Sequence, residues 1–242
     1  MKYMLFMLFI LFTLAYSKAQ KGEVIANIPE ASGIAYDAQN HRLIVVNDEG
    51  TYYEITPEGR VTLKKKLGKY DLEGVAVEDD TLIFAIENKG LLLVNKKTGK
   101  KKKVIIDTIY KGKKLPLFSK KSGVEGIARV GDFFYLSKQS KKKKDSFIAV
   151  VKLKPYPSRV VDVIKHKIPD TAGLTHHDGF LYMVSDKKNL LIQYHLEKRK
   201  IIKKIKLEKG AWEGIAFDDK SNLYLADDNG RVVKYKKKAL GL

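Results

Sequence analysis

The stretch "DLEGVAVEDDTLIFAIENKG", residues 71–90, places a glycine after an acidic residue and then runs into apolar segments. Its core, Glu-Gly-aliphatic-Ala, returns at residues 125–128 and again at 213–216. Two looser copies lie at residues 32–35 and 172–175. The glycines of the five copies are 41, 52, 47 and 41 residues apart. The chain therefore repeats a unit of somewhat more than 40 residues.

Each unit contains further strand-like segments. The second apolar runs are residues 43–46, 82–86, 133–136, 181–184 and 223–226. The third runs are residues 52–55, 91–94, 147–153, 190–194 and 232–235, and a lysine-rich fourth segment follows in the first four units. The runs are rich in Val, Ile, Tyr and Phe and end at Gly, Asn or Asp, which is typical of strands and turns. Four strands per unit at this period predict β-propeller blades.

The fifth unit stops after its third strand, whereas residues 23–28 form one extra strand before the first unit. We expect this N-terminal strand to complete the last blade, because an open array would leave two unpaired sheet edges. The sequence thus predicts an all-β protein, a five-bladed β-propeller of four-stranded antiparallel blades closed by the N-terminal strand. Residues 20–242 would form this single domain.

The repeated glycine and the repeated acid have different explanations. Inner strands of a propeller crowd around the axis, where a glycine permits close backbone approach. The acids at the starts of the inner strands, and those at the ends of the second strands, should gather at one mouth of the axis. The candidate metal ligands are Glu73, Glu125, Glu213, Asp48, Glu87, Asp186 and Asp227.

Carboxylates gathered in a partly desolvated mouth repel one another unless a cation compensates them. Oxygen ligands without cysteine or a clear histidine pair suit calcium better than zinc or copper. The alternative is structural: each Glu accepts hydrogen bonds from backbone amides of the neighbouring blade. The two interpretations are compatible, since some acids can bind the ion while others act as such latches.

The order of these motifs resembles the SdiA-regulated, YjiK-like proteins. The resemblance rests on residues 32–37, 47–50, 71–74, 123–128 and 212–218, and it covers essentially the whole mature chain. Residues 214–227 are also similar to NHL repeats. The resemblance implies an exported five-bladed propeller with a calcium site. Glu73, Glu125 and Glu213 match the acidic position of the family motif, while Ser32 and Ala172 replace it in the other copies, so any site would be asymmetric.

The N-terminus has the pattern of a secretory signal peptide: Lys2, an apolar stretch at residues 4–15, and small residues at Ser17 and Ala19. We expect residues 1–19 to be cleaved after Ala19 and the protein to be periplasmic or secreted. An uncleaved anchor is the alternative, although the stretch is shorter than the roughly 20 residues that a span needs.

Other features of the chain are expected to be structural. His176 and His177 are predicted to be surface residues near a turn at the opposite mouth, and Trp212 either packs between blades or forms a ligand platform. The net charge is +19, or +17 without residues 1–19, and the excess lies in lysine runs. Because these runs fall largely in the fourth strands, we expect them to protect exposed sheet edges rather than to recognise nucleic acid. Weak attraction to an anionic envelope surface is compatible with this charge.

These observations predict a monomeric, exported calcium-binding propeller that acts as a binding module for an unknown ligand or protein partner at the acidic mouth. A calcium-dependent hydrolase of phosphoesters or lactones is the alternative, because a bound ion can polarise a scissile group. A polyanion-binding protein is a third possibility. The fold alone does not separate them.

Overall fold

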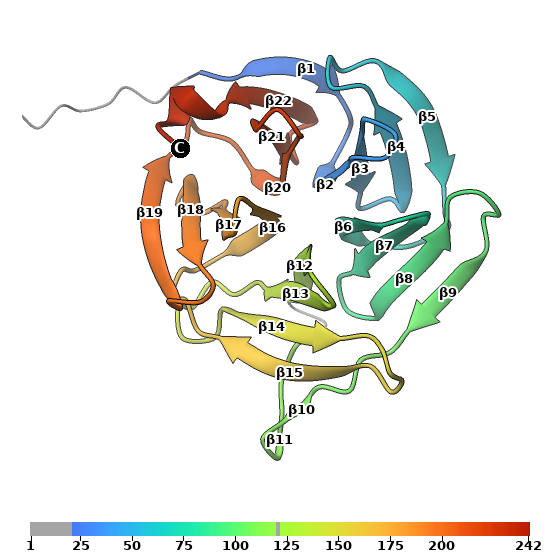
Figure 1. Cartoon of the computed structure of the whole chain (residues 1–242), viewed down its shortest axis with the longest axis vertical. Coiled ribbons are helices and arrows are strands. Elements are labelled where there is room, and N and C mark those ends of the chain that lie inside the picture. The colour runs from blue at the N-terminus through green and yellow to red at the C-terminus, as the bar shows by residue number, and fades with distance from the viewer. Residues whose placement is uncertain (1–20, 120–121) are drawn as a thin grey trace, which may run out of the picture.

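The computed structural model describes residues 21–119 and 122–242, which form five four-stranded antiparallel sheets arranged around one axis (Figure 1). The predicted signal peptide, residues 1–19, lies outside the described residues. In the part of the chain that is described, no helix has the length and apolar character needed to cross a membrane.

Each sheet is one blade, and its strands follow the chain from the axis outward. Blade 1 contains β2 (Ala31–Asp37), β3 (Arg42–Asn47), β4 (Thr51–Ile55) and β5 (Val61–Lys66). Blade 2 contains β6 (Leu72–Glu78), β7 (Thr81–Ile86), β8 (Gly90–Asn95) and β9 (Lys101–Val104). Blade 3 contains β12 (Val124–Val130), β13 (Phe133–Lys138), β14 (Phe147–Lys152) and β15 (Arg159–Ile164). Blade 4 contains β16 (Thr171–His177), β17 (Phe180–Ser185), β18 (Leu190–His195) and β19 (Lys200–Lys206).

Blade 5 joins the two ends of the chain. It contains β20 (Trp212–Phe217), β21 (Asn222–Asp227), β22 (Arg231–Lys236) and, as its outer strand, β1 (Glu23–Asn27). β1 pairs antiparallel with β22, with Glu23 opposite Lys234 and Asn27 opposite Arg231. The predicted five-bladed ring and its closure by the N-terminal strand are therefore confirmed.

Two short elements lie outside the repeat. The small hairpin of β10 (Ile109–Tyr110) and β11 (Lys113–Lys114) belongs to the connection from blade 2 to blade 3. It projects outward next to β15, the outer strand of blade 3 (Figure 1). It accounts for the longest of the spacings between the repeated glycines. A 3₁₀ turn, η1 (Lys237–Leu240), follows the last strand.

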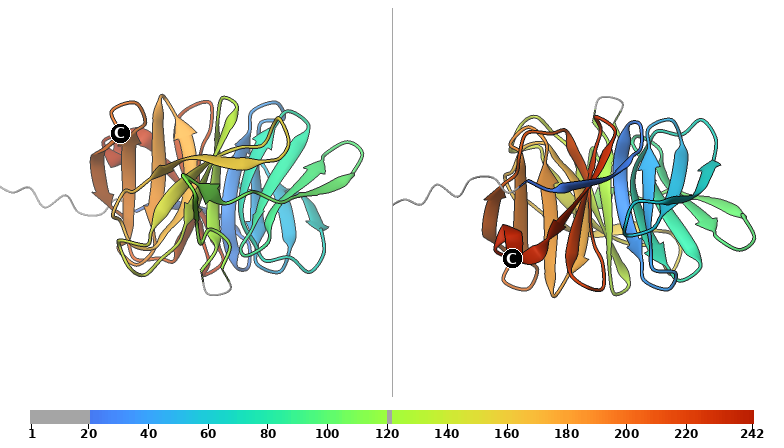
Figure 2. Two further views of the ribbon diagram at one scale, coloured as in Figure 1. Left: turned by 90° about the horizontal axis from the view of Figure 1, so that it is seen from below. Right: turned by 90° about the horizontal axis from the view of Figure 1, so that it is seen from above.

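The hydrophobic core lies between the blades. Strands β3, β7, β17 and β21 are buried on both faces, which is why their sequences are continuous apolar runs rather than alternating ones. Between blades 1 and 2, for example, Tyr52 lies against Phe84 with the ring centroids 5.7 Å apart. Seen from the side, the five blades together form a short cylinder around the axis (Figure 2).

The five repeated glycines form a ring at the centre. A Cβ added to Gly74 would lie 2.9 Å from the Cα of Gly126, and one added to Gly126 would lie 2.9 Å from the Cα of Gly173. The ring leaves a space of only about 10 Å³ on the axis, about enough for one water molecule. Any larger residue would push the blades apart, so the glycines set the diameter of the propeller.

Candidate site at the acidic mouth

The repeated acid of the sequence motif occupies a β-bulge at the start of the inner strand in blades 2, 3 and 5. In blade 2, Leu72 pairs with Ile86 and Gly74 pairs with Ala85, so Glu73 has no partner in the ladder. The same shift leaves Glu125 and Glu213 unpaired in blades 3 and 5. A bulge turns its extra residue away from the regular face alternation of the strand. The repeated bulge therefore directs these side chains out of their own sheets.

Glu73 and Glu125 are nine-tenths buried, with 9% and 7% of their surface exposed. Glu213 is partly buried. Among the described residues, no backbone amide donates a hydrogen bond to any of the three carboxylates, whereas a hydrogen bond joins Glu73 to Glu125. The latch interpretation therefore does not describe these three side chains.

In the two blades that lack the Glu, a serine hydroxyl forms a hydrogen bond between neighbouring blades. Ser32, at the bulge of blade 1, donates from its Oγ to the carbonyl oxygen of Leu72 in blade 2 at 2.5 Å. At the bulge of blade 4, Ser137 of blade 3 donates to the carbonyl oxygen of Ala172, also at 2.5 Å. Hydroxyl groups thus join neighbouring blades where the acid is absent.

The ends of the second strands bring a second set of acids to the same mouth. Asp48, Glu87 and Asp186 each follow the last residue of β3, β7 or β17. In blade 5 the residue at the equivalent position is Asp228, because Asp227 is the last residue of β21 and pairs with Trp212. Sequence reasoning chose Asp227 because register within a run of two aspartates cannot be read without the strand pairing.

Asp227 is fully engaged inside blade 5. Its carboxylate accepts hydrogen bonds from the amides of Ala211 and Asn229 and forms an ion pair with Arg231. Burial acts to raise the pKa of this group, but the hydrogen bonds from Arg231 and Asn229 outweigh it and lower the pKa. Of the seven candidate ligands, Asp227 is the one whose surroundings already compensate its charge.

Three further carboxylates at this mouth were missed by sequence reasoning. Glu30, Asp71 and Asp170 immediately precede the inner strands β2, β6 and β16. Asp71 acts on Asp48, Glu73 and Glu87 as a like charge and shares a hydrogen bond with Glu87. The signal that could have found them is their common position, two residues before the bulge.

Burial and mutual repulsion raise the pKa values of the mouth acids. Burial, followed by the charges of Glu125 and Glu213, raises the pKa of Glu73 well above its usual range. Burial and Glu87 raise the pKa of Glu125. Burial and Asp228 raise the pKa of Glu213 to about 9 and that of Asp48 to about 6. The pKa values of Glu87 and Asp186 are also raised, first by burial.

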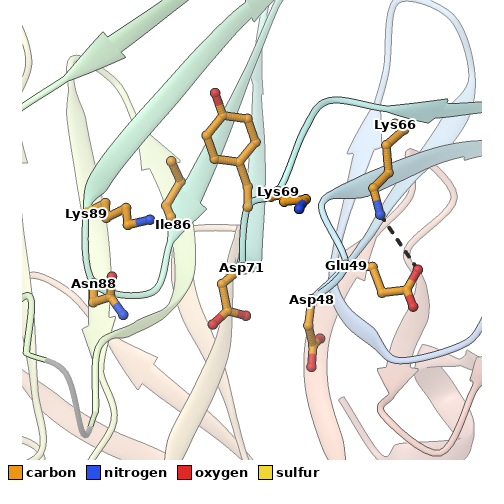
Figure 3. A pocket seen from close by; sticks show the side chains of 9 residues that line it. Asp48, Glu49, Lys66, Lys69, Asp71, Ile86, Asn88 and Lys89 are labelled. Carbon is orange, nitrogen blue, oxygen red and sulfur yellow. Dashed lines mark ion pairs between the residues drawn. The ribbon is translucent and has the colours of Figure 1, made fainter.

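A pocket of about 690 Å³ opens beside this mouth, between blades 1 and 2 (Figure 3). The carboxylates of Asp48 and Asp71 lie along one side of it and point the same way, while Lys69 and Lys89 lie around it. Glu49 forms a long ion pair with Lys66 at its edge, 3.8 Å. The pocket therefore has carboxylates along one side and a rim of lysines around it.

The donor set fits a hard divalent cation in its chemistry. It consists of carboxylates, two of them nine-tenths buried and without a backbone donor, and such groups are costly unless a cation or a proton neutralises them. In the described residues, no three acidic or histidine side chains already converge closely enough to enclose an ion. Binding would therefore require the acidic side chains to rotate toward one another.

The opposite mouth is different in character. His176 and His177 belong to β16 and are half-buried, so the expectation of surface histidines beside a turn was wrong in this respect. The His177 ring stacks on Phe217 of the next blade at 4.4 Å, and its Nε2 lies 3.0 Å from Ser221 Oγ. Packing between blades explains both the burial and the position of His177.

Trp212 and the lysine runs have structural roles. Trp212 is completely buried, and its indole N–H donates to the carbonyl oxygen of Glu208 at 2.9 Å, so the packing interpretation holds and the ligand platform does not. The lysines of β5, β9 and β19 lie on the outermost strands of their blades. This agrees with a role in protecting exposed edges.

Comparisons with known proteins agree with this architecture. Among solved structures, the chain is similar to glutaminyl cyclase from Myxococcus xanthus, with a TM-score of 0.68 and 12% sequence identity, over 90% of this chain and 94% of that one. BamB from Moraxella catarrhalis is more distant, with a TM-score of 0.44 and 14% identity, over 85% of this chain and 58% of that one. At these identities the first likeness shows the shared fold alone. No curated protein matches the chain in sequence. The model of the family described as SdiA-regulated matches residues 11–234, and the chain belongs to this family.

Proposed function

We propose that this protein is an exported calcium-dependent binding module whose ion lies at the acidic mouth. The observation that carries the proposal is the pair Glu73 and Glu125. Both are nine-tenths buried, neither receives a hydrogen bond from a described backbone amide, and Glu213 adds a third charge. A divalent cation would remove this repulsion and would supply open coordination positions to a ligand.

The pocket between blades 1 and 2 supports a binding role for the same mouth. It has the size of small-molecule sites, and Asp48 and Asp71 connect it to the acidic mouth. A ligand held there could contact the ion and the lysine rim together. We therefore place the ligand of the binding module in this pocket.

Calcium binding is tested by isothermal titration calorimetry and by thermal unfolding of the mature chain, in EDTA and in millimolar calcium. A ligand at one hundred times its dissociation constant stabilises by about 2.7 kcal/mol, which for a domain of this size corresponds to about 5–10 °C in Tm. The double variant Glu73→Gln/Glu125→Gln should lose most of that shift.

The matched control is Glu197→Gln, which makes the same chemical change at an exposed residue in the turn between β18 and β19. It should keep the full calcium response. Absence of any calcium heat and any Tm shift in the unmodified protein would end the proposal.

The hydrolase alternative is separated by activity. A binding module shows no calcium-dependent turnover on a panel of phosphoesters and lactones, whereas a hydrolase would show turnover that Glu125→Gln abolishes. Export is tested independently, since N-terminal sequencing of the mature protein should begin at Gln20.

A further inference from the structure

Another pocket lies between blades 2 and 3, away from the acidic mouth. Its volume is about 510 Å³, which is the size of small-molecule sites. Glu78, the last residue of β6, and Asp132, in the turn between β12 and β13, both line it. The pocket therefore lies toward the end of the blades opposite to the acidic mouth. It shares no lining residue with the pocket between blades 1 and 2.

The floor of this pocket is apolar. Leu93, Phe134 and Leu153 line it and belong to the hydrophobic cluster that joins blades 2 and 3. Leu93 and Leu153 are only partly buried, so the pocket exposes apolar surface of this cluster to solvent. Removing such surface from water is favourable, so an apolar ligand that covered the floor would be stabilised there.

Blade 2 differs from three other blades at Leu93. Strand pairing places polar residues at the same position in blades 1, 4 and 5: Glu54, Gln193 and Lys234. Each of these polar side chains forms a hydrogen bond within the protein. Blade 3 has Val150, which is buried. Blade 2 is thus the blade that presents a partly exposed apolar side chain at this position.

The charge around the floor is positive. Three lysines line the pocket: Lys102, Lys152 and Lys154. None of them forms an ion pair with a described residue. Of the two acids in the lining, Glu78 is already paired with Arg129 at 3.2 Å, which leaves Asp132 against three lysines. The pocket therefore attracts an anion.

The loop between β14 and β15 carries an exposed aromatic ring at the rim of the pocket. Tyr156 belongs to the lining, and 75% of its surface is exposed. Pro155 and Pro157 flank it and restrict the backbone of the loop. Less conformational entropy is then lost when the ring packs on a ligand.

We propose that this pocket is a second ligand site, which binds small amphipathic anions: molecules with an apolar body and one anionic head group. The apolar body lies on Leu93, Phe134 and Leu153 and contacts the ring of Tyr156. The head group lies among the three lysines. This site needs no metal ion, so it is independent of the calcium binding proposed above.

The test is a fluorescence titration of the mature chain with anilinonaphthalene sulfonate, a probe that joins an aromatic body to one sulfonate group. The titration is made in EDTA, so that calcium does not contribute. We expect saturable binding that weakens as the salt concentration rises, because salt screens the attraction between the sulfonate and the lysines. A natural chain that shows no saturable binding would overturn the inference.

Two variants test where the probe binds. Lys102→Met/Lys154→Met removes two exposed charges and should weaken binding about fivefold, since an exposed charge pair contributes up to about 1 kcal/mol. Leu93→Gln introduces the side chain that blade 4 has at this position and should weaken binding about tenfold, because it removes apolar surface from the floor. The double lysine variant changes only exposed side chains, so it keeps the test valid if Leu93→Gln does not fold.

Lys198→Met/Lys204→Met is the matched control for the lysine variant. It removes the same charge from blade 4, at one exposed lysine in the turn before the outer strand and one on that strand. It should bind the probe like the natural chain. The inference is overturned if this control loses as much affinity as Lys102→Met/Lys154→Met, or if neither that variant nor Leu93→Gln changes the affinity.

Competition against the bound probe tests the chemistry of the ligand. Octanoate and phenylpropionate supply an acyl and an aromatic body with the same head group, and the one that displaces the probe at lower concentration identifies the body that the floor prefers. Octanol and phenylpropanol lack the charge and should be at least about fivefold weaker competitors, by the same charge contribution. Alcohols that compete as well as the acids would refute the role of the lysines.

Discussion

A methyl group on Gly126 would lie 2.4 Å from the carbonyl oxygen of Ala172 in the next blade. Backbone atoms cannot yield to such a contact without moving a strand, and the same close approach recurs from blade to blade. The axis is therefore packed by backbone alone, and this packing holds the acidic mouth to its narrow diameter.

Gly126→Ala should consequently destabilise the propeller strongly. Overpacking in a core costs about 1–3 kcal/mol, and we expect the upper end because the obstacle is backbone. Urea unfolding followed by circular dichroism measures the change. Gly131→Asn is the control, since Gly131 has open space around it and a positive φ that Asn tolerates. An equal loss of unfolding free energy in the two variants would contradict the conclusion that backbone contacts pack the axis.

Glu125→Gln should stabilise the protein when calcium is absent. The substitution removes a charge that burial and Glu87 disfavour, and one pKa unit corresponds to about 1.4 kcal/mol, so a gain of about 1–3 kcal/mol at pH 8 is expected. Chemical unfolding in EDTA measures it. When the measurement is repeated in calcium, the natural chain should be more stable than the variant. A variant that is less stable than the natural chain in EDTA would contradict uncompensated repulsion at Glu125.

The stability of the calcium-free protein should fall as the pH rises. The folded pKa values of Asp48, about 6, and Glu213, about 9, exceed their ordinary values of 3.8 and 4.5. The folded state therefore binds more protons than the unfolded state between about pH 4 and 9, and its stability decreases across that window. Thermal unfolding in EDTA at a series of pH values measures this slope. Because protons compete with calcium, the Tm increase caused by calcium should be larger at pH 8 than at pH 5.5, and the reverse order would refute the assignment.

Asp227 and Asp228 should respond differently to the same substitution. Asp227→Asn removes the ion pair with Arg231, whose side chain is partly exposed, and weakens the hydrogen bonds that the buried carboxylate accepts. It should cost about 1.5–3 kcal/mol of stability, with little effect on the calcium affinity per folded molecule. Asp228→Asn should leave stability in EDTA unchanged or improved while weakening calcium binding about tenfold. Isothermal titration calorimetry measures the calcium affinity of both variants, and urea unfolding in EDTA measures their stability. The assignment of the two aspartates would be reversed if a folded Asp227→Asn protein bound calcium more weakly while Asp228→Asn bound it with unchanged affinity.

The fold could be predicted from the sequence because one local requirement recurs in every blade. A glycine at the bulge and a continuous apolar second strand are both visible without knowing any long-range contact. The candidate site was only partly predictable. Choosing between Asp227 and Asp228 needed the pairing of β20 with β21. Asp71 and Asp170 were overlooked because they precede the strands and belong to no apolar pattern.

The pairing of β1 with β22 has a consequence for the order of events during synthesis. Val24 pairs with Val233, so the first described strand finds its partner only after the strands of blades 1 to 4 have been made. Contacts of such long sequence separation form slowly. The β1 segment must therefore stay unpaired while blades 1 to 4 are made, and the ring can close only when β22 is available.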